Sequence, residues 1–220
     1  MPKGSLDRYL PCLQTMGSIH LLFLCAICLI FSPCSRGTRS QRPNRRIDNP
    51  IDRIRAQNNF NVQQFTGVWY LISVGSMCGY LKLNNHRLEA VTVKVTNQDQ
   101  DIRINTLRKL DGLCWDIKQD YKMDATPGRF SRKNRGVKTD IVIAETDYTN
   151  YAILFLQQRR KITVKLYGRG IEVSEPVHLK FRQFVIDNNI PEVFIYVFPR
   201  YGHCDVADEF HQLDDDFGKS

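Results

Sequence analysis

The feature that most constrains the fold is a succession of short segments in which apolar and polar side chains alternate. In the second of them Val91, Val93 and Val95 fall on one face, and Thr92 and Lys94 fall on the other. A period of two is typical of a β-strand with one buried face. Eight such segments follow one another, at residues 69–74, 88–95, 102–107, 114–121, 128–131, 140–146, 151–157 and 162–167. This regular spacing predicts an all-β sandwich or barrel.

The period changes to that of a helix after the eighth segment. Ser174 is a suitable N-cap, and Pro176 is tolerated in a first helical turn. An apolar stripe at helical spacing follows, made of Val177, Phe181, Phe184 and Val185. Pro191 ends the helix, and residues 193–198 form a last short strand. A single late helix can cover the outer wall of a barrel, although periodicity alone also allows a two-sheet sandwich.

The N-terminal region contains an unbroken apolar run over residues 21–31. Eleven residues are too few to span a bilayer but suit the core of a signal peptide. We therefore expect a signal peptide over residues 1–37, with an approximate end and a true start at Met1 or Met16. An uncleaved anchor is the alternative. The rest of the mature chain carries no apolar segment long enough to insert into a membrane.

The remaining chain divides by composition into an arm, a domain and a tail. Residues 38–58 form a basic, proline-bearing arm, 59–213 hold the folded domain, and 214–220 are an acidic tail. The arm supplies much of the formal charge of +8. Its arginines alternate with polar residues, and no aromatic side chain interleaves them before Phe60. That pattern favours a flexible, solvated arm over a nucleic-acid partner.

The cysteine count indicates a link to another protein. Removal of residues 1–37 takes away Cys12, Cys25, Cys28 and Cys34. The mature chain keeps Cys78, Cys114 and Cys204, an odd number in an oxidising compartment. One disulfide and one additional cysteine are expected, and the additional cysteine is either paired with a second chain or a buried, inert thiol.

Three short motifs occur in the order and spacing of the lipocalin signature. They are Gly67-Val68-Trp69, Thr146-Asp147-Tyr148 and Arg169. On these residues the chain resembles the lipocalin family. The resemblance implies an eight-stranded up-and-down antiparallel lipocalin barrel, with one C-terminal α-helix packed outside and a short final strand. Such a barrel has room for one small ligand.

Physical roles follow for the signature residues. Gly67 permits close backbone approach where the barrel closes, and Trp69 fills the closed end. Arg169 can stack its guanidinium on the tryptophan ring, and Asp147 can cap a tight turn. These roles are structural, and we expect no catalytic residue among them.

Longer stretches resemble the complement subunits of the family, notably 74–78, 109–115 and 198–204. The resemblance implies an intrachain disulfide between Cys114 and Cys204. It also implies an interchain disulfide from Cys78 to the alpha chain of a pore-forming complement component. Through that chain the protein would associate with a beta chain and with the membrane attack complex.

Cys78 is predicted to lie at the open mouth of the barrel. It follows Trp69 by nine residues, which rise about 30 Å at about 3.3 Å per residue of strand. The position falls in an expected loop over residues 79–85. A disulfide to another chain and any ligand binding would then share one end of the molecule.

Two other functions remain open from the sequence. One is a free extracellular carrier of a small hydrophobic ligand such as a retinoid, held by interior residues such as Val91 and Leu154. The other is an enzyme that uses Cys78 with His86 or Arg87, but no geometry supports it. The mature histidines show no metal-ligand spacing, so neither a metal nor a cofactor is expected.

Overall fold

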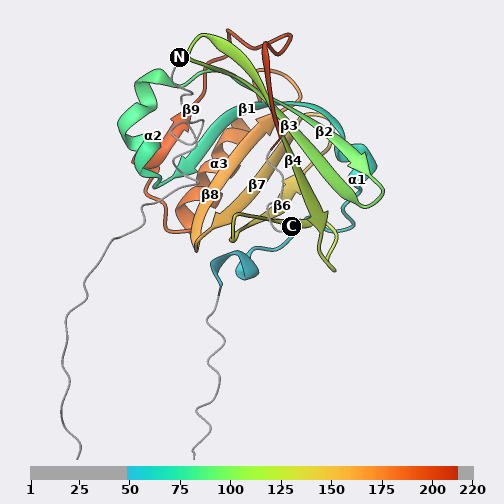
Figure 1. Ribbon diagram of the computed structural model, residues 1–220. Helices are drawn as coiled ribbons and strands as arrows, with labels where there is room; N and C mark the ends of the chain where they lie inside the picture. The colour runs from blue at the N-terminus through green and yellow to red at the C-terminus, as the bar shows by residue number, and fades with distance from the viewer. Residues whose placement is uncertain (1–48, 213–220) are drawn as a thin grey trace, which may run out of the picture.

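The structure, a computed structural model, describes residues 49–212. The predicted signal peptide, most of the predicted arm and the acidic tail lie outside this range. Eight antiparallel strands wrap into a barrel (Figure 1). The strands are β1 (Gly67–Ser76), β2 (Val91–Gln98), β3 (Asp101–Leu110), β4 (Leu113–Met123), β5 (Arg129–Asn134), β6 (Val137–Thr146), β7 (Tyr151–Gln158) and β8 (Lys161–Gly168).

The strand pairings close the sheet on itself. Each of β1 to β7 pairs antiparallel with the next strand along the chain, and β8 pairs antiparallel with β1. The join between β4 and β5 is short, at Lys122–Ser131 and Met123–Phe130. Closure satisfies the backbone of both edge strands. The predicted up-and-down barrel is confirmed, and the sandwich alternative is excluded.

The mouth segment differs from the expected loop. Residues 79–87 form the helix α2 (Gly79–Asn84) and the 3-10 turn η3 (Asn85–Arg87), so β2 begins at Val91 rather than at residue 88. At the other end of β1, the short helix α1 (Val62–Phe65) precedes the barrel. Its N-cap, Asn61, accepts a hydrogen bond from the backbone N–H of Gln64.

The predicted outer helix is α3 (Glu175–Asp187), which packs outside the barrel (Figure 1). Ser174 occupies the N-cap position, but its side chain makes no capping hydrogen bond. The 3-10 turn η4 (Glu192–Phe194) replaces the first part of the expected last strand, which is confined to β9 (Ile195–Val197) beside β1. An additional strand, β10 (Glu209–Gln212), pairs parallel with β4.

The end of the predicted arm packs against the barrel. Residues 50–53 form the 3-10 turn η2 (Pro50–Arg53), and Ile51 is buried in the outer core. The backbone N–H of Gln57 donates to the carbonyl of Ile143. Residues 49–58 therefore form part of the folded unit, because an apolar side chain and backbone hydrogen bonds hold them to the wall.

Two apolar clusters lie on the two sides of the barrel wall. The inner cluster fills the lumen and includes Trp69, Val93, Ile102, Phe130, Ile143 and Tyr167. The outer cluster lies between the wall and α3 and includes Ile72, Val142, Phe155, Leu166, Phe181 and Val185. Alternate residues of one strand therefore belong to different cores, as the pleat of a β-strand requires.

A β-bulge in β1 sets which residues face α3. The pairing of β1 with β8 shifts between Leu71 and Ser73. Beyond the bulge, Gly75 faces outward beneath the helix. A Cβ atom at Gly75 would lie 2.4 Å from Cγ2 of Val185, which is closer than any non-bonded contact allows. Close helix packing at this point depends on the absence of a side chain.

We expect Gly75→Ala to lower the free energy of unfolding by about 1–3 kcal/mol, because the added methyl group overpacks the contact with Val185. Urea denaturation of both forms measures the change. Gly79→Ala is the matched control, since a Cβ at Gly79 meets no atom within 4 Å. Equal unfolding midpoints for Gly75→Ala and the unsubstituted protein would contradict the packing argument.

Candidate functional site

The closed end of the barrel is built around Arg169. Its guanidinium lies 3.7 Å from the centroid of the Trp69 ring. The tryptophan is buried, and its Nε1 donates to the carbonyl of Phe65 at 2.9 Å. The arginine also donates to four backbone carbonyls, those of Tyr148, Val68, Gln64 and Thr66. One side chain thus joins α1, β1 and the turn between β6 and β7.

Gly67 lies directly against this arginine. Its φ is +105°, a backbone conformation that side-chain-bearing residues rarely adopt. A Cβ atom here would lie 2.9 Å from an Arg169 guanidinium nitrogen. A glycine is required at this position for both reasons.

The Thr146-Asp147-Tyr148 segment forms the turn between β6 and β7. Oδ1 of Asp147 accepts hydrogen bonds from the backbone N–H groups of Asn150 at 2.8 Å and Tyr151 at 3.0 Å. Burial opposes ionisation of Asp147, but these hydrogen bonds outweigh it and lower the pKa of the carboxyl group. The hydroxyl of Tyr148 accepts from the backbone N–H of Asn61. The turn is therefore tied to the closed end.

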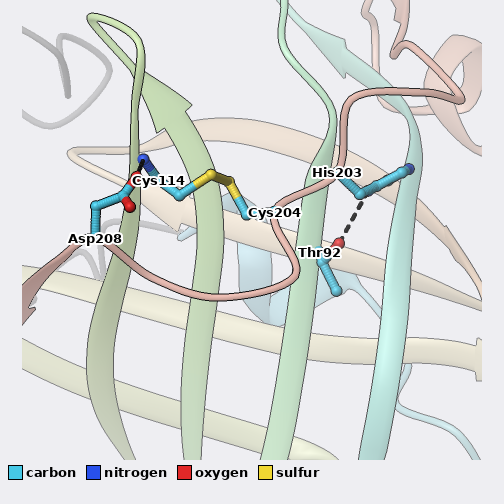
Figure 2. Close-up of a disulfide and its surroundings, with 5 residues drawn as sticks. All are labelled: Thr92, Cys114, His203, Cys204 and Asp208. Carbon is cyan, nitrogen blue, oxygen red and sulfur yellow. Dashed lines mark hydrogen bonds between the residues drawn. A yellow bond between two sulfur atoms is a disulfide. The ribbon is translucent and has the colours of Figure 1, made fainter.

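Cys114 and Cys204 are joined by a disulfide, with their Cα atoms 5.8 Å apart (Figure 2). It closes a loop of 90 residues. The chain-entropy treatment gives such a bridge about 4–5 kcal/mol of stabilisation. Asp208, four residues later, accepts from the backbone N–H of Cys114 and returns a backbone hydrogen bond to its carbonyl. These contacts hold the segment after Cys204 along β4, and β10 then pairs with that strand.

His203, beside this disulfide, attaches the tail to a second strand. Its Nδ1 is hydrogen-bonded to Oγ1 of Thr92 at 2.9 Å, as Figure 2 shows. The ring meets Tyr70 edge-on, with centroids 5.0 Å apart. Burial lowers the pKa of His203 below its ordinary value, although Asp205 opposes the shift. The neutral imidazole is therefore the form that the fold favours.

Cys78 lies at the opposite end of β1 from Trp69, as the N-cap residue of α2. It is half-exposed, and its backbone N–H donates to Oγ of Ser76. His86 and Arg87 lie in η3. The sequence predicted a loop around Cys78; the helix there gives this residue a fixed position at the mouth.

The exposure of inward-facing side chains increases from the closed end of the barrel toward its mouth. Inward residues near Trp69, such as Ile102, Phe130 and Ile143, are fully buried. Inward residues nearer the mouth keep part of their surface exposed; they are Ile104, Thr106, Arg108, Trp115, Gln119, Leu156, Thr163 and Lys165.

No group of histidine, cysteine, aspartate and glutamate side chains within residues 49–212 is arranged to hold a metal ion. Within the same range, no helix combines the length and the apolar character needed to cross a membrane. The sequence analysis did not single out Lys165 and Arg108, because only the pairing of the strands between β3 and β8 brings these two residues near each other.

We expect Arg169→Lys to destabilise the fold by about 2–4 kcal/mol. Lysine keeps the charge but lacks the planar fork that stacks on Trp69 and reaches four carbonyls, so several backbone acceptors lose their donor. Urea denaturation measures the loss. Arg200→Lys is the control, because Arg200 makes an exposed ion pair with Glu172. Equal losses in the two variants would refute the role assigned to Arg169.

We expect stability to fall as pH drops below about 6.5, in part through His203. A lowered folded-state pKa means that the unfolded chain takes up the proton first, so protonation favours unfolding. Urea midpoints at pH 7.5 and about 5.5 should differ less in His203→Asn than in the unsubstituted protein. His86→Asn, at an exposed histidine, should leave the difference unchanged. An unchanged difference in His203→Asn would contradict the assignment.

Comparison with known proteins agrees with this architecture. The chain of the solved structure "The Siderocalin Ex-FABP functions through dual ligand specificities" superposes with a TM-score of 0.57. It is 17% identical, and the match covers 63% of this chain and 96% of that one. At this identity the likeness shows the fold alone.

The sequence relatives are more informative. The rabbit (Oryctolagus cuniculus) complement component C8 gamma chain is 39% identical over 191 residues, which cover 86% of this chain and 94% of the relative. Bovine (Bos taurus) protein AMBP is 28% identical over 70% of this chain, but the match spans only 46% of AMBP. The profile of the lipocalin / cytosolic fatty-acid binding protein family matches residues 66–201. The chain therefore belongs to the lipocalin family.

Proposed function

We propose that this protein is a non-enzymatic, secreted lipocalin subunit that is disulfide-linked through Cys78 to the complement component eight alpha chain. Through that chain it associates with the beta chain and takes part in the membrane attack complex. The observation that carries the proposal is the 39% identity to a C8 gamma chain along nearly its whole length. The segments 74–78, 109–115 and 198–204, which contain Cys78, Cys114 and Cys204, carry the sequence resemblance described above.

The position of Cys78 supports the covalent link. It is the half-exposed N-cap of α2, at the mouth end of β1. Cys114 and Cys204 are already joined, and every other cysteine of the chain falls within the proposed signal peptide, residues 1–37. Once that segment is removed, any disulfide formed by Cys78 would have to be with a cysteine of another chain.

The surface around Cys78 is suited to a protein partner. Apolar side chains are strongly exposed on α2 and on the adjoining η4 and β9, among them Leu83, Val193 and Val197. Lys82 of α2 lies 4.1 Å from the centroid of the Phe194 ring, which joins these elements into one face. A groove of about 370 Å³ lies beside them, between η3 and β9. Exposed apolar surface beside a groove is typical of an interaction site.

Co-expression with the complement component eight alpha chain of the same species tests the tether. Non-reducing electrophoresis should show one covalent species that separates into two chains on reduction. Cys78→Ser should abolish it. The double variant Cys114→Ser, Cys204→Ser is the matched control; it should be less stable but should keep the covalent species. A monomer whose Cys78 pairs within its own chain, established by mass spectrometry of a non-reduced digest, would overturn the proposal.

A second function is the carriage of a small hydrophobic ligand in the lumen. The observation that favours it is the gradient of exposure along inward-facing residues, from buried near Trp69 to half-exposed near the mouth. Such a lumen offers an apolar closed end and a more exposed mouth. Native mass spectrometry of the protein from its extracellular source should then detect a stoichiometric small molecule. Complete absence of bound mass, both in purified protein and after incubation with retinoids and fatty acids, would exclude carriage.

A further inference from the structure

Two neighbouring turns at the mouth end of the barrel are strongly basic. One joins β5 to β6, and the other joins β7 to β8. The second lies at the mouth because Ser76, at the mouth end of β1, pairs with Thr163 of β8. The exposed cations on and beside these turns, here called the basic rim, are Lys133, Arg135, Lys138, Arg159, Arg160 and Lys161.

The register of the strands brings the basic rim together. Lys133 of β5 pairs directly with Lys138 of β6. Thr139 of β6 pairs with Gln158 of β7, so Lys138 and Arg159 follow that pair on the mouth side. Neighbouring strands are about 4.8 Å apart, and like charges at directly opposed positions are destabilising. The cations are therefore crowded on one part of the mouth at a cost to the fold.

Few carboxylates lie near the basic rim. Residues 125–139 and 148–171 include no aspartate or glutamate. Lys138 forms an ion pair with Asp140 at 2.6 Å. The hydrogen bond to Asp140 raises the pKa of Lys138, burial opposes the shift, and the charges of Asp124 and Asp52 add to it. These three carboxylates are outnumbered by the six cations, so this part of the mouth has an excess of positive charge.

The β7–β8 turn has arginines where folding favours other residues. Arg159 and Arg160 are its two central residues, and their φ angles are +47° and +64°. Two-residue hairpin turns of this kind favour Asn-Gly, because side-chain-bearing residues adopt a positive φ at a cost in stability. Arg135 in the β5–β6 turn also has a positive φ, of +46°. Cations at positions that local folding disfavours indicate a role other than stability.

The basic arm joins the domain beside the same turn. The side chain of Gln157, next to the β7–β8 turn, accepts from the backbone N–H of Ile51 at 2.9 Å and donates to the side chain of Asn49. Arg45 and Arg46 precede Asn49 by four and three residues in the sequence. Four residues of chain span at most about 14 Å, so chain connectivity keeps both arginines within that distance of Asn49. The arm therefore adds positive charge on this side of the barrel.

The chemistry around the basic rim favours one kind of polyanion. None of the strongly exposed apolar side chains among residues 49–212 lies on β5 to β8 or their turns, so no anchor for a bilayer is present there. Anionic lipids are in addition concentrated in the cytoplasmic leaflet, which a secreted protein does not meet. The turn residues 133–138 and 158–161 include no aromatic side chain that could stack on a nucleic-acid base.

We propose that the basic rim binds a sulfated glycosaminoglycan. The arginine fork binds oxyanions in a bidentate way, and several exposed cations at strand spacing match the repeated sulfates of such a chain. Binding would also relieve the repulsion between the crowded cations. This inference rests on the secreted location included in the proposed function, because these polysaccharides are extracellular.

Isothermal titration calorimetry of the secreted chain with a heparin oligosaccharide tests the proposal. The double variant Arg159→Asn, Arg160→Gly removes two charges of the basic rim and introduces the turn sequence that the backbone favours. At about 0.15 M NaCl it should bind heparin about tenfold more weakly, and its affinity should depend less steeply on salt, because fewer counter-ions are released. Its urea midpoint should be equal to or higher than that of the unsubstituted protein, which separates loss of binding from loss of folding.

The double variant Lys94→Gln, Arg200→Gln is the matched control, since it removes two exposed cations outside the basic rim. Lys94 pairs with Val68, near the closed end of the barrel. The control should bind heparin within about twofold of the unsubstituted protein, because salt screens distant charges. Equal weakening in the two double variants would overturn the assignment to the basic rim.

Two further ligands test the chemical class. Desulfated heparin, which has the same backbone and fewer charges, should bind at least about tenfold more weakly than heparin. Vesicles that contain phosphatidylserine should bind more weakly than heparin as well. Equal affinity for heparin and for either of these ligands would overturn the proposal. Recovery of the chain from culture medium tests secretion separately, and electrophoresis with the alpha chain tests the tether, so each failure is recognised by its own measurement.

Discussion

A closed β-sheet gives each residue of a strand only two environments, the lumen and the outer surface. The rest of this structure depends on that constraint. The inner cluster and the outer cluster beneath α3 both follow from the same alternation. A β-bulge locally changes which residues point inward. The bulge between Leu71 and Ser73 of β1 turns Gly75 toward α3 and Val74 toward the lumen beside Lys165.

The two ends of the barrel differ in the contacts that their side chains make. At the closed end, Arg169 binds four carbonyls and covers the Trp69 ring, so few groups there remain able to meet a ligand. At the mouth, α2 connects Cys78, its N-cap, to Tyr80, which contacts Arg108 within the lumen. A partner attached through Cys78 would therefore lie beside the entrance to the proposed ligand site. Tethering and ligand binding are expected to influence each other.

Sequence patterns predicted the regular parts well and the irregular parts poorly. Alternation located all eight barrel strands, because half-buried strands require it. Residues 79–85 were predicted to form a loop, because the six residues of helix α2 (Gly79–Asn84) are too few to show a helical period. The strand β10 was missed because Glu209–Gln212 has little alternation; its pairing with β4 depends on the disulfide and on Asp208. Ser174 was placed correctly, but its capping bond is absent.

The sequence by itself determined the class of fold, the positions of the signature residues and the odd cysteine count after the proposed cleavage. Each of these is local or is a matter of counting. Only the tertiary structure decided which face of each strand points into the lumen, because barrel closure and β-bulges determine which alternate residues point inward. It alone brought Lys165 and Arg108 together from β8 and β3, and set the basic β5–β6 and β7–β8 turns side by side. Charges distant in sequence interact only when the folded chain brings them close together in space.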